Sequence, residues 1–438
     1  MVTNPILYNE LHRFWPEASL SDRMARFKDM PLADAQEFFR ELSTRHQYEI
    51  TINLPDREQT VWLRLLDPDD AADLIQEAQI GNREHLLELL DETTKDDVHA
   101  LLKYREDVAG GLMSPRFARV PPDMTVSEAL TYVRKQALGR ATETVYTVYV
   151  LDNEQHLLGV TSLRTLFVSD PHHLIKDIMR TNVVTAPEQA DQEKLSRLFA
   201  EHDLIAIPIV DAENHMKGIV TIDDIVDVVQ EEATEDIQKM GGSEALGVPY
   251  LDISFWLMVR KRAGWLTVLF LGEMLTANAM AYYEEQIARA VVLMLFVPLI
   301  ISSGGNAGSQ ASTIVIRAMA LGELRLSDWW QVMRREVLTG LTLGCILGAI
   351  GLARIVIGET YFHAYGPHSL LVGITVGLAL IGIVFWGSLA GSLLPFVLRR
   401  VGLDPASAST PFVATLVDVT GLIIYFSVAS LVLRGTLL

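Results

Sequence analysis

Five apolar segments in the C-terminal part of the chain limit its possible folds more than any other feature. They lie near residues 263–281, 290–316, 337–357, 369–396 and 411–433. A helix that crosses a bilayer needs about 20 such residues. Residues 254–438 hold only 9 of the 55 acidic and 12 of the 36 basic residues, whereas residues 1–253 carry a formal charge of −22. The sequence therefore predicts an α-helical membrane domain joined to an acidic part that is exposed to water.

The Arg and Lys residues beside these segments predict their orientation. Basic residues lie just before the first segment, in the loop between the second and third segments, and in the loop between the fourth and fifth. They are Arg260, Lys261, Arg262, Arg317, Arg325, Arg334, Arg335, Arg399 and Arg400. The loop at 358–368 has neither Arg nor Lys. Because cytoplasmic flanks are rich in these residues, we expect five spans, cytoplasmic N-terminal domains and a C-terminus outside. No signal peptide is evident, so we expect the acidic part to stay in the cytoplasm. The expected location of the whole protein is the inner (plasma) membrane, as a multi-pass protein.

The second apolar segment turns polar half-way along, in the stretch SSGGNAGSQAS. The apolar run before it, AVVLMLFVPLII, has 12 residues, too few to cross alone, so the polar stretch must lie at membrane depth. In a helix, polar side chains would share one face at Ser302, Asn306, Ser309 and Thr313. Gly304 and Gly308 would let another helix approach closely. Helix packing alone is one interpretation, but the density of amides and hydroxyls favours a face toward protein or a water-filled cavity.

The fifth apolar segment carries a carboxylate near its middle, Asp418. An intramembrane carboxylate marks an ion pathway or proton relay by default, and a buried protonated or salt-bridged Asp is the alternative. With Asn306 and the exposed backbone carbonyls beside the glycines of the second segment, Asp418 would form an all-oxygen lining. Hard cations prefer oxygen, and Mg²⁺ keeps several waters, so two such carboxylates across a dimer axis would suit it. Glu273 in the first segment raises the same question, and we favour a packing or partner role for it.

Two repeats, at about 111–177 and 178–232, fill the middle of the acidic part. Each has a short extended run, a Pro and an amphipathic helix, and they close with VYTVYVLDNEQHLLGVTSLRTLFV and AIPIVDAENHMKGIVTIDDIVDVV. This pattern strongly resembles a tandem pair of CBS domains, α/β modules that commonly bind adenine nucleotides. Thr221 and Asp224 match the ribose-binding hydroxyl and carboxylate of that family. The resemblance implies ATP or another adenine nucleotide as a ligand, and an empty cleft is the alternative.

Ahead of the repeats, LLDPDDAADLI and LLDETTKDDVHALL recur at a spacing of 24 residues. Each places Asp near a helix start and apolar residues at helical spacing, which predicts an acidic, all-α superhelical N domain at 25–110. Residues 1–24 carry no informative pattern. We expect residues 233–253 to form a linker helix before the membrane domain, 254–438. Acidic residues gathered along this linker repel one another, so they are either a solvated face or a surface that closes when divalent cations bind.

This order of parts resembles the MgtE family of magnesium channels and transporters over nearly the full chain. The most specific matches are PLIISSGGNAGSQASTIVIRAMALGEL and DPASASTPFVATLVDVTGLIIYF. The resemblance implies a homodimer in the lipid bilayer, with the second and fifth spans lining the pore and Asp418, Asn306 and Gly305 at the pore Mg²⁺. It also implies that the linker at 233–253 is a plug helix. Cytosolic Mg²⁺ would close the channel by binding acidic residues, which match at Asp191, Glu193, Asp203, Asp224, Asp227, Glu232, Glu235 and Asp236.

Three functions remain open from the sequence. The leading hypothesis is a Mg²⁺-selective channel gated by Mg²⁺, and no enzyme activity is expected because no nucleophile–base set or phosphate-cradling loop is recognised. The alternative is a secondary transporter that exchanges a divalent cation for Na⁺ or H⁺ at Asp418, with the CBS pair as nucleotide sensor. The third is a membrane-anchored nucleotide sensor without transport. The acidic excess argues against nucleic acid as a partner, because phosphates need basic surfaces.

Overall fold

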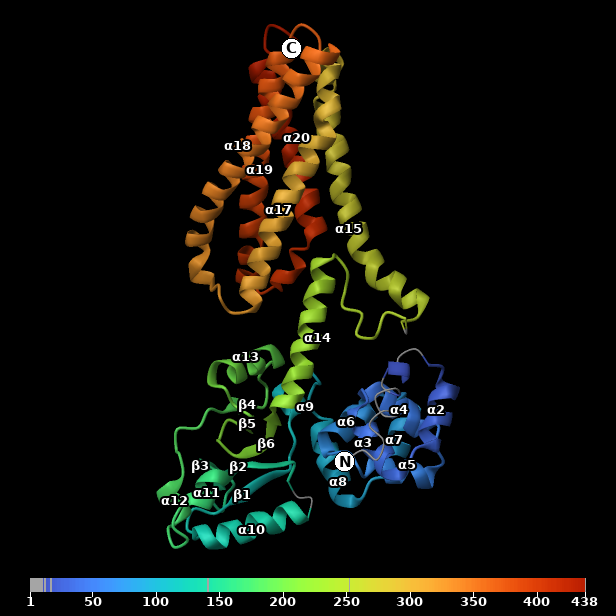
Figure 1. Cartoon of the computed structure of the whole chain (residues 1–438), viewed down its shortest axis with the longest axis vertical. Helices are drawn as coiled ribbons and strands as arrows, with labels where there is room; N and C mark the ends of the chain where they lie inside the picture. The colour runs from blue at the N-terminus through green and yellow to red at the C-terminus, as the bar shows by residue number, and fades with distance from the viewer. Residues whose placement is uncertain (1–10, 12, 16–17, 140–141, 252, 438) are drawn as a thin grey trace. The chain divides into compact units, whose positions relative to one another are not determined.

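The computed structural model describes residues 11, 13–15, 18–139, 142–251 and 253–437 (Figure 1). The chain divides into two compact units, residues 1–230 and 231–438, which are described in turn. Residues 1–24, for which the sequence makes no prediction, lie partly outside the described residues.

From residue 20 on, where the structure describes every residue of this part, seven short helices form the N-terminal part of the first unit. They are α2 (Leu20–Asp29), α3 (Leu32–Glu41), α4 (Thr44–Ile52), α5 (Asp56–Leu63), α6 (Pro68–Glu77), α7 (Ile80–Glu88) and α8 (Glu92–Leu101). The two Asp-led repeats of the sequence became α6 and α8, as predicted. Pro68 begins α6, where its missing N–H costs nothing, and the Asp91 side chain accepts a hydrogen bond from the Thr94 N–H at the start of α8. Phe38 and Phe39 are fully buried in the core between these helices.

Two small sheets with the same topology follow, which confirms the α/β repeat. Their strands run in the orders β1-β2-β3 and β4-β5-β6, and in each sheet the first pair is parallel and the second antiparallel. The strands are β1 (Phe117–Val120), β2 (Thr144–Leu151), β3 (Leu157–Ser162), β4 (Ala186–Pro187), β5 (Ala206–Val210) and β6 (Met216–Thr221). The accompanying helices are α9 (Ala109–Leu112), α10 (Val126–Leu138), α11 (Leu163–Val168), α12 (Ile175–Ile178) and α13 (Gln192–His202).

The helix α14 (Ile222–Met240) begins directly after β6 and contains most of the predicted acidic run. Its last turn contacts the loop before the final helix of the chain. Lys239 Nζ donates to Asp404 Oδ2 at 2.6 Å and also pairs with Glu235 one turn earlier. One lysine therefore connects two carboxylates from different segments of the second unit.

The second unit consists mainly of long apolar helices, at α15 (Phe255–Tyr282), α16 (Glu284–Arg289), η2 (Val291–Phe296), α17 (Val297–Ala320), η3 (Leu326–Asp328), α18 (Trp329–Phe362), α19 (Ser369–Arg400), η4 (Pro405–Ser407) and α20 (Thr410–Val432). Four stretches of the described residues are long and apolar enough to cross a membrane, at 291–320, 326–362, 369–400 and 410–432. The first predicted span lies in α15, whose 28 residues include Glu273 and Asn278, two side chains that lower its hydropathy.

Glycines let the backbones of α17, α18 and α19 approach closely (Figure 1). A Cβ on Gly308 would lie 2.8 Å from Val413 Cγ1 and 3.0 Å from the Gly387 carbonyl oxygen. A Cβ on Gly344 would lie 2.8 Å from the Cα of Ile381. The close helix approach predicted from the paired glycines of α17 is therefore confirmed.

Candidate functional site

The polar stretch predicted at membrane depth lies in α17, and its polar side chains divide between two faces. Ser302, Asn306 and Thr313 are exposed on the single chain, and Asn306 Nδ2 lies 3.4 Å from Ser302 Oγ as a long hydrogen bond. Ser309 is half-buried, because its Oγ donates to the Thr410 carbonyl at 3.3 Å at the start of α20. The exposed face thus carries hydroxyls and an amide, while Ser309 joins α17 to α20.

Asp418 lies in α20 beside this part of α17. A Cβ on Gly305 would lie 3.7 Å from Asp418 Oδ1 and 3.5 Å from the Ala414 Cβ, which are ordinary contact distances. Asp418 is half-buried in the single chain. The absence of a side chain at Gly305 therefore leaves the carboxylate directly beside the α17 backbone. The structure brings two of the three predicted pore residues into contact distance and places Asn306 on the adjoining exposed face.

A second carboxylate reaches the same region from α15. A Cβ on Gly272 would lie 2.9 Å from Thr415 Cγ2, so α15 and α20 pack closely at this point. Glu273, the next residue, lies close enough for its charge to act on Asp418. The structure therefore places Glu273 near Asp418, and the packing or partner role favoured for Glu273 from the sequence stays a prediction.

Buried polar contacts hold α20 in place on either side of Asp418. Tyr425 is fully buried, and its hydroxyl donates to the Leu293 carbonyl at 2.9 Å in η2. Trp386 Nε1 in α19 donates to Thr420 Oγ1 at 2.8 Å. These bonds satisfy groups that lipid cannot satisfy and fix the rotation of α20.

The acidic residues predicted to bind regulatory Mg²⁺ do not form one cluster on a single chain. Asp191 caps α13 and accepts from the Glu193 N–H at 2.9 Å, whereas Asp203 ends the same helix in a left-handed conformation with φ 52°. Those two ends are ~16 Å apart for an 11-residue helix. The other predicted residues lie along α14, at Asp224, Asp227, Glu232, Glu235 and Asp236.

One predicted residue, Asp224, belongs to a group of three carboxylates that sequence reasoning did not bring together. Asp69 at the start of α6, Glu143 just before β2 and Asp224 in the first turn of α14 each offer an oxygen within 4.8 Å of the others. Thr221 Oγ1 donates to Asp224 Oδ2 at 2.9 Å, so the predicted nucleotide pair is also in contact here. Three segments far apart in sequence therefore meet at one acidic point, called the acidic triad below.

Burial and mutual repulsion raise the pKa values of the acidic triad. Burial, followed by the neighbouring Glu143, raises the pKa of Asp224 to about 8 and that of Asp69 well above its ordinary range. Burial also raises the pKa of Glu143 to about 7. Asp69 is only 8 % exposed, and among the described residues neither its Oδ1 nor the Glu143 Oε2 has a hydrogen-bond partner. Buried, unpartnered carboxylate oxygens are ligands that a divalent cation satisfies.

Sequence reasoning missed Asp69 and Glu143 for different reasons. Asp69 was visible only as one of several acids at a helix start, where a carboxylate ordinarily stabilises the helix dipole. Glu143 lies outside every motif that the repeats define. Only the folded structure, which brings both side chains close to Asp224, distinguishes them from the exposed acids beside them.

Comparisons with known proteins match each part of the chain to a family. Residues 8–107 match the MgtE intracellular N domain, residues 107–169 and 175–231 match the CBS domain, and residues 297–428 match the MgtE divalent cation transporter domain. A solved structure of the cytosolic domain of the Mg²⁺ channel MgtE in complex with ATP shares 38 % identity. It covers 50 % of this chain and 90 % of its own length, with a TM-score of 0.48.

Full-length relatives extend the similarity across both units. The magnesium transporter MgtE of Thermus thermophilus is 39 % identical over 97 % of this chain and 93 % of its own length. The magnesium transporter MgtE of Bacillus subtilis is 29 % identical over 92 % of this chain and 90 % of its own. The matches to the MgtE N domain, the CBS pair and the MgtE membrane domain follow one another along this chain, and the Thermus protein is similar over nearly its whole length, so this chain belongs to the MgtE family of magnesium transporters.

Proposed function

We propose that this chain conducts Mg²⁺ across the inner (plasma) membrane as a homodimeric channel, with α17 and α20 lining the pore. The observation that carries the proposal is the contact between Asp418 and Gly305, next to the exposed polar face of α17. Lipid does not satisfy Ser302, Asn306 and Thr313, so these side chains require water or a second copy of the chain. Two Asp418 carboxylates across a dimer axis would balance the charge of one hydrated Mg²⁺.

Mg²⁺ uptake by a host that requires added Mg²⁺ tests the pore. Asp418→Ala is expected to abolish uptake, because it removes the only acidic residue of α20. Glu284→Gln, which changes an exposed carboxylate in α16, is the matched control and is expected to retain uptake. Normal uptake by Asp418→Ala at equal membrane abundance would refute the pore assignment.

An exchanger is a second candidate, favoured by Glu273 near Asp418. Two carboxylates at one site suit the alternate binding of a divalent cation and protons or Na⁺. A unitary current through purified protein under a Mg²⁺ gradient alone supports the channel and excludes obligatory exchange. Flux that stops when the Na⁺ and H⁺ gradients are both removed supports the exchanger.

We further propose that cytosolic Mg²⁺ closes the channel by binding acidic residues of the N domain, CBS pair and α14. The proposed regulatory ligands are the acidic triad together with Asp191, Glu193, Asp203, Asp227, Glu232, Glu235 and Asp236. A cation shifts a conformational equilibrium only by its difference in affinity for the two states, and repelling acids supply that difference. Combined neutralisation of Asp224, Asp227 and Asp236 should leave the pore open at Mg²⁺ levels that close the parent. Unchanged closure would contradict this.

An adenine nucleotide such as ATP is the ligand that we propose for the second CBS repeat, with Thr221 and Asp224 binding the ribose. Because Asp224 also belongs to the acidic triad, nucleotide and cation binding should influence one another. Titration calorimetry with ATP on the full chain should show binding that Asp224→Ala weakens. Equal affinity in the variant would exclude Asp224 from the nucleotide site.

The orientation proposed is cytoplasmic N-terminal domains and a C-terminus outside. Its support is the placement of Arg and Lys beside the apolar helices, with Arg399 and Arg400 ending α19. Reporter fusions at the C-terminus and in the loop after α19 should report opposite sides. The same side for both would contradict a membrane crossing by α20, and a cytoplasmic C-terminus would contradict the proposed orientation.

A further inference from the structure

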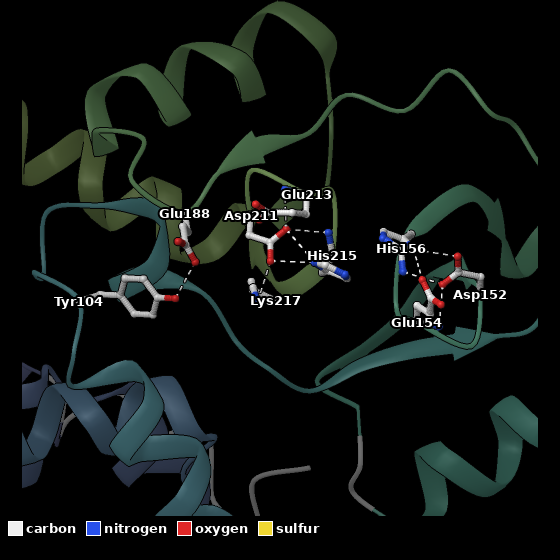
Figure 2. A network of polar contacts seen from close by, with 9 residues as sticks. All are labelled: Tyr104, Asp152, Glu154, His156, Glu188, Asp211, Glu213, His215 and Lys217. Atoms are coloured by element: carbon white, nitrogen blue, oxygen red, sulfur yellow. Dashed lines mark hydrogen bonds and ion pairs between the residues drawn. The ribbon is translucent and has the colours of Figure 1, made fainter.

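The two CBS repeats meet through their hairpin turns, and each turn carries the same polar pattern. The first turn contains Asp152, Glu154 and His156, and the second contains Asp211, Glu213 and His215, both with the spacing Asp-x-Glu-x-His. His156 and His215 form an isolated antiparallel bridge. The backbones also join, since the Leu157 N–H donates to the Asn214 carbonyl and the Met216 N–H to the Gln155 carbonyl. Figure 2 shows both groups.

Each Asp holds its own turn and then faces the histidine of that turn. Asp211 Oδ1 accepts from the backbone N–H groups of Glu213 and His215 at 3.0 and 2.8 Å, and Asp152 Oδ1 does the same in the first turn. His215 Nδ1 lies 3.0 and 3.2 Å from the two Asp211 carboxylate oxygens. The turn geometry explains the Asp residues. It does not require a Glu and a His beside them.

The two imidazole rings stack on one another. Their centroids are 4.3 Å apart and their planes differ by 24°. His156 is fixed by Asp152 at 2.8 Å from its Nδ1, so it supports the ring of His215 from the other repeat. About a third of the His215 side chain is exposed, and Glu213 is exposed as well, so an ion can reach the group from solvent.

We propose that Asp211, Glu213 and His215 bind a late first-row divalent metal ion such as Zn²⁺, Co²⁺ or Ni²⁺. A carboxylate oxygen of each acid and a ring nitrogen of His215 lie within 4.8 Å of one another (Figure 2). Ligand atoms of a tetrahedral ion lie ~3.4 Å apart for bonds of about 2.1 Å, so a small rotation of the exposed Glu213 side chain closes the site. A nitrogen ligand favours these metals over Mg²⁺, which prefers oxygen alone.

The charge around the site favours a cation. The two turns carry four carboxylates, at Asp152, Glu154, Asp211 and Glu213, while Arg119 donates to Gln155 of the first turn and one lysine follows the second turn. That lysine, Lys217, lies with its Nζ 2.9 Å from Asp211 Oδ2, where it competes with a metal for the carboxylate. Loss of the Lys217 ammonium group should therefore strengthen metal binding. If the ion pair of Lys217 only stabilised the fold, its loss would not strengthen metal binding.

The experiment uses tag-free, full-length protein in detergent with millimolar Mg²⁺ present throughout. Zn²⁺ binding is measured by equilibrium dialysis, and the coordination is observed from the visible absorption of bound Co²⁺. The parent should bind Zn²⁺ at this site despite the Mg²⁺, and its Co²⁺ spectrum should show nitrogen and oxygen ligation. His215→Gln and Glu213→Gln should each weaken Zn²⁺ binding at least about tenfold, and Lys217→Met should tighten it.

His172→Gln is the matched control, since His172 is an exposed histidine two residues after Asp170 outside the two turns. Glu213 is on the surface, so its substitution tests the site without endangering the fold. Parent-like Zn²⁺ binding in both His215→Gln and Glu213→Gln would overturn the proposal. Weaker binding in Lys217→Met, or complete displacement of Zn²⁺ by millimolar Mg²⁺, would also overturn it.

Discussion

Replacing Asp224 by Asn tests whether the acidic triad is a site whose repulsion Mg²⁺ relieves. Two unit charges 4.8 Å apart repel by about 3.5 kcal/mol at an effective dielectric of about 20. The pKa of Asp224 rises from 3.8 to about 8, which at 1.36 kcal/mol per unit corresponds to about 6 kcal/mol for full ionisation. Both figures indicate that a fully charged triad destabilises the first unit substantially when no cation is bound.

The sign of the pH dependence follows from the raised pKa. Below pH about 4 the carboxyl of Asp224 is protonated in both the folded and the unfolded chain, so it contributes no destabilisation. As pH rises from about 4 to about 8, the unfolded chain loses the proton while the folded chain keeps it, and stability falls. The loss is complete above pH about 8, where the folded chain is ionised as well.

Hydrogen exchange of the α6 peptide, measured by mass spectrometry on the nucleotide-free full chain, reports this change in stability locally, because Asp69 lies in the first turn of α6. Mg²⁺ at about 100 times its dissociation constant stabilises the bound state by about 2.7 kcal/mol, which slows exchange about a hundredfold. Above pH about 8, Asp224→Asn should exchange more slowly than the parent without Mg²⁺ and should respond much less to added Mg²⁺. Near pH 4 the two should agree.

Asp96→Asn is the matched control, because Asp96 is an exposed acid in α8 outside the triad. It should leave both the Mg²⁺-free exchange of α6 and the Mg²⁺ response at parent values. A full Mg²⁺ response in Asp224→Asn, or faster Mg²⁺-free exchange above pH about 8, would refute the reasoning.

Three further changes test the packing of the second unit. Gly308→Ala places a methyl group 2.8 Å from a side-chain carbon of α20 and should destabilise the purified protein by about 1–3 kcal/mol. Gly305→Ala is its control, because the added methyl group meets only atoms 3.5 Å or more away, and this variant should keep parental thermal stability. Tyr425→Phe leaves the buried Leu293 carbonyl without its donor and should cost about 1–3 kcal/mol, measured by thermal unfolding in detergent. Lys239→Met removes the ion pairs of Lys239 with Glu235 and Asp404, and should raise the rate of hydrogen exchange in the last turn of α14. Parental values for Gly308→Ala, Tyr425→Phe or Lys239→Met would contradict the contact concerned.

Patterns that are local in sequence predicted most of the architecture. Helical spacing and Asp-led starts identified α6 and α8, and the repeated strand–turn–strand pattern identified the two sheets. The same spacing placed Asn306 and Ser302 on one face of α17, where they are exposed together. These features depend on periodicity within about 20 residues, which a single sequence displays directly.

Contacts between distant segments could not be read in this way. Asp69, Glu143 and Asp224 are separated by more than 70 residues each, and nothing in their neighbouring sequence distinguishes Asp69 from Asp70. The difference is where the side chain points after folding, since Asp69 turns toward Glu143 and Asp224 while its Oδ1 stays without a partner among the described residues. Glu273 and Asp418 are a similar case, because only the packing of Gly272 against Thr415 brings the two carboxylates to one crossing.

The acids that matter most for cation binding are therefore expected among the less visible ones. The exposed Asp227 of α14 is already solvated, so a cation gains little by replacing water there. A buried carboxylate that cannot pair with a donor has lost its water and gained nothing in exchange, so a divalent cation has the largest differential affinity for that arrangement. Asp69 and Glu143, rather than the exposed Asp227, should therefore dominate the Mg²⁺ response of the first unit. When acidic residues are neutralised one at a time, the size of the effect on channel closure should increase with the burial of the residue and not with the number of acids beside it in the sequence.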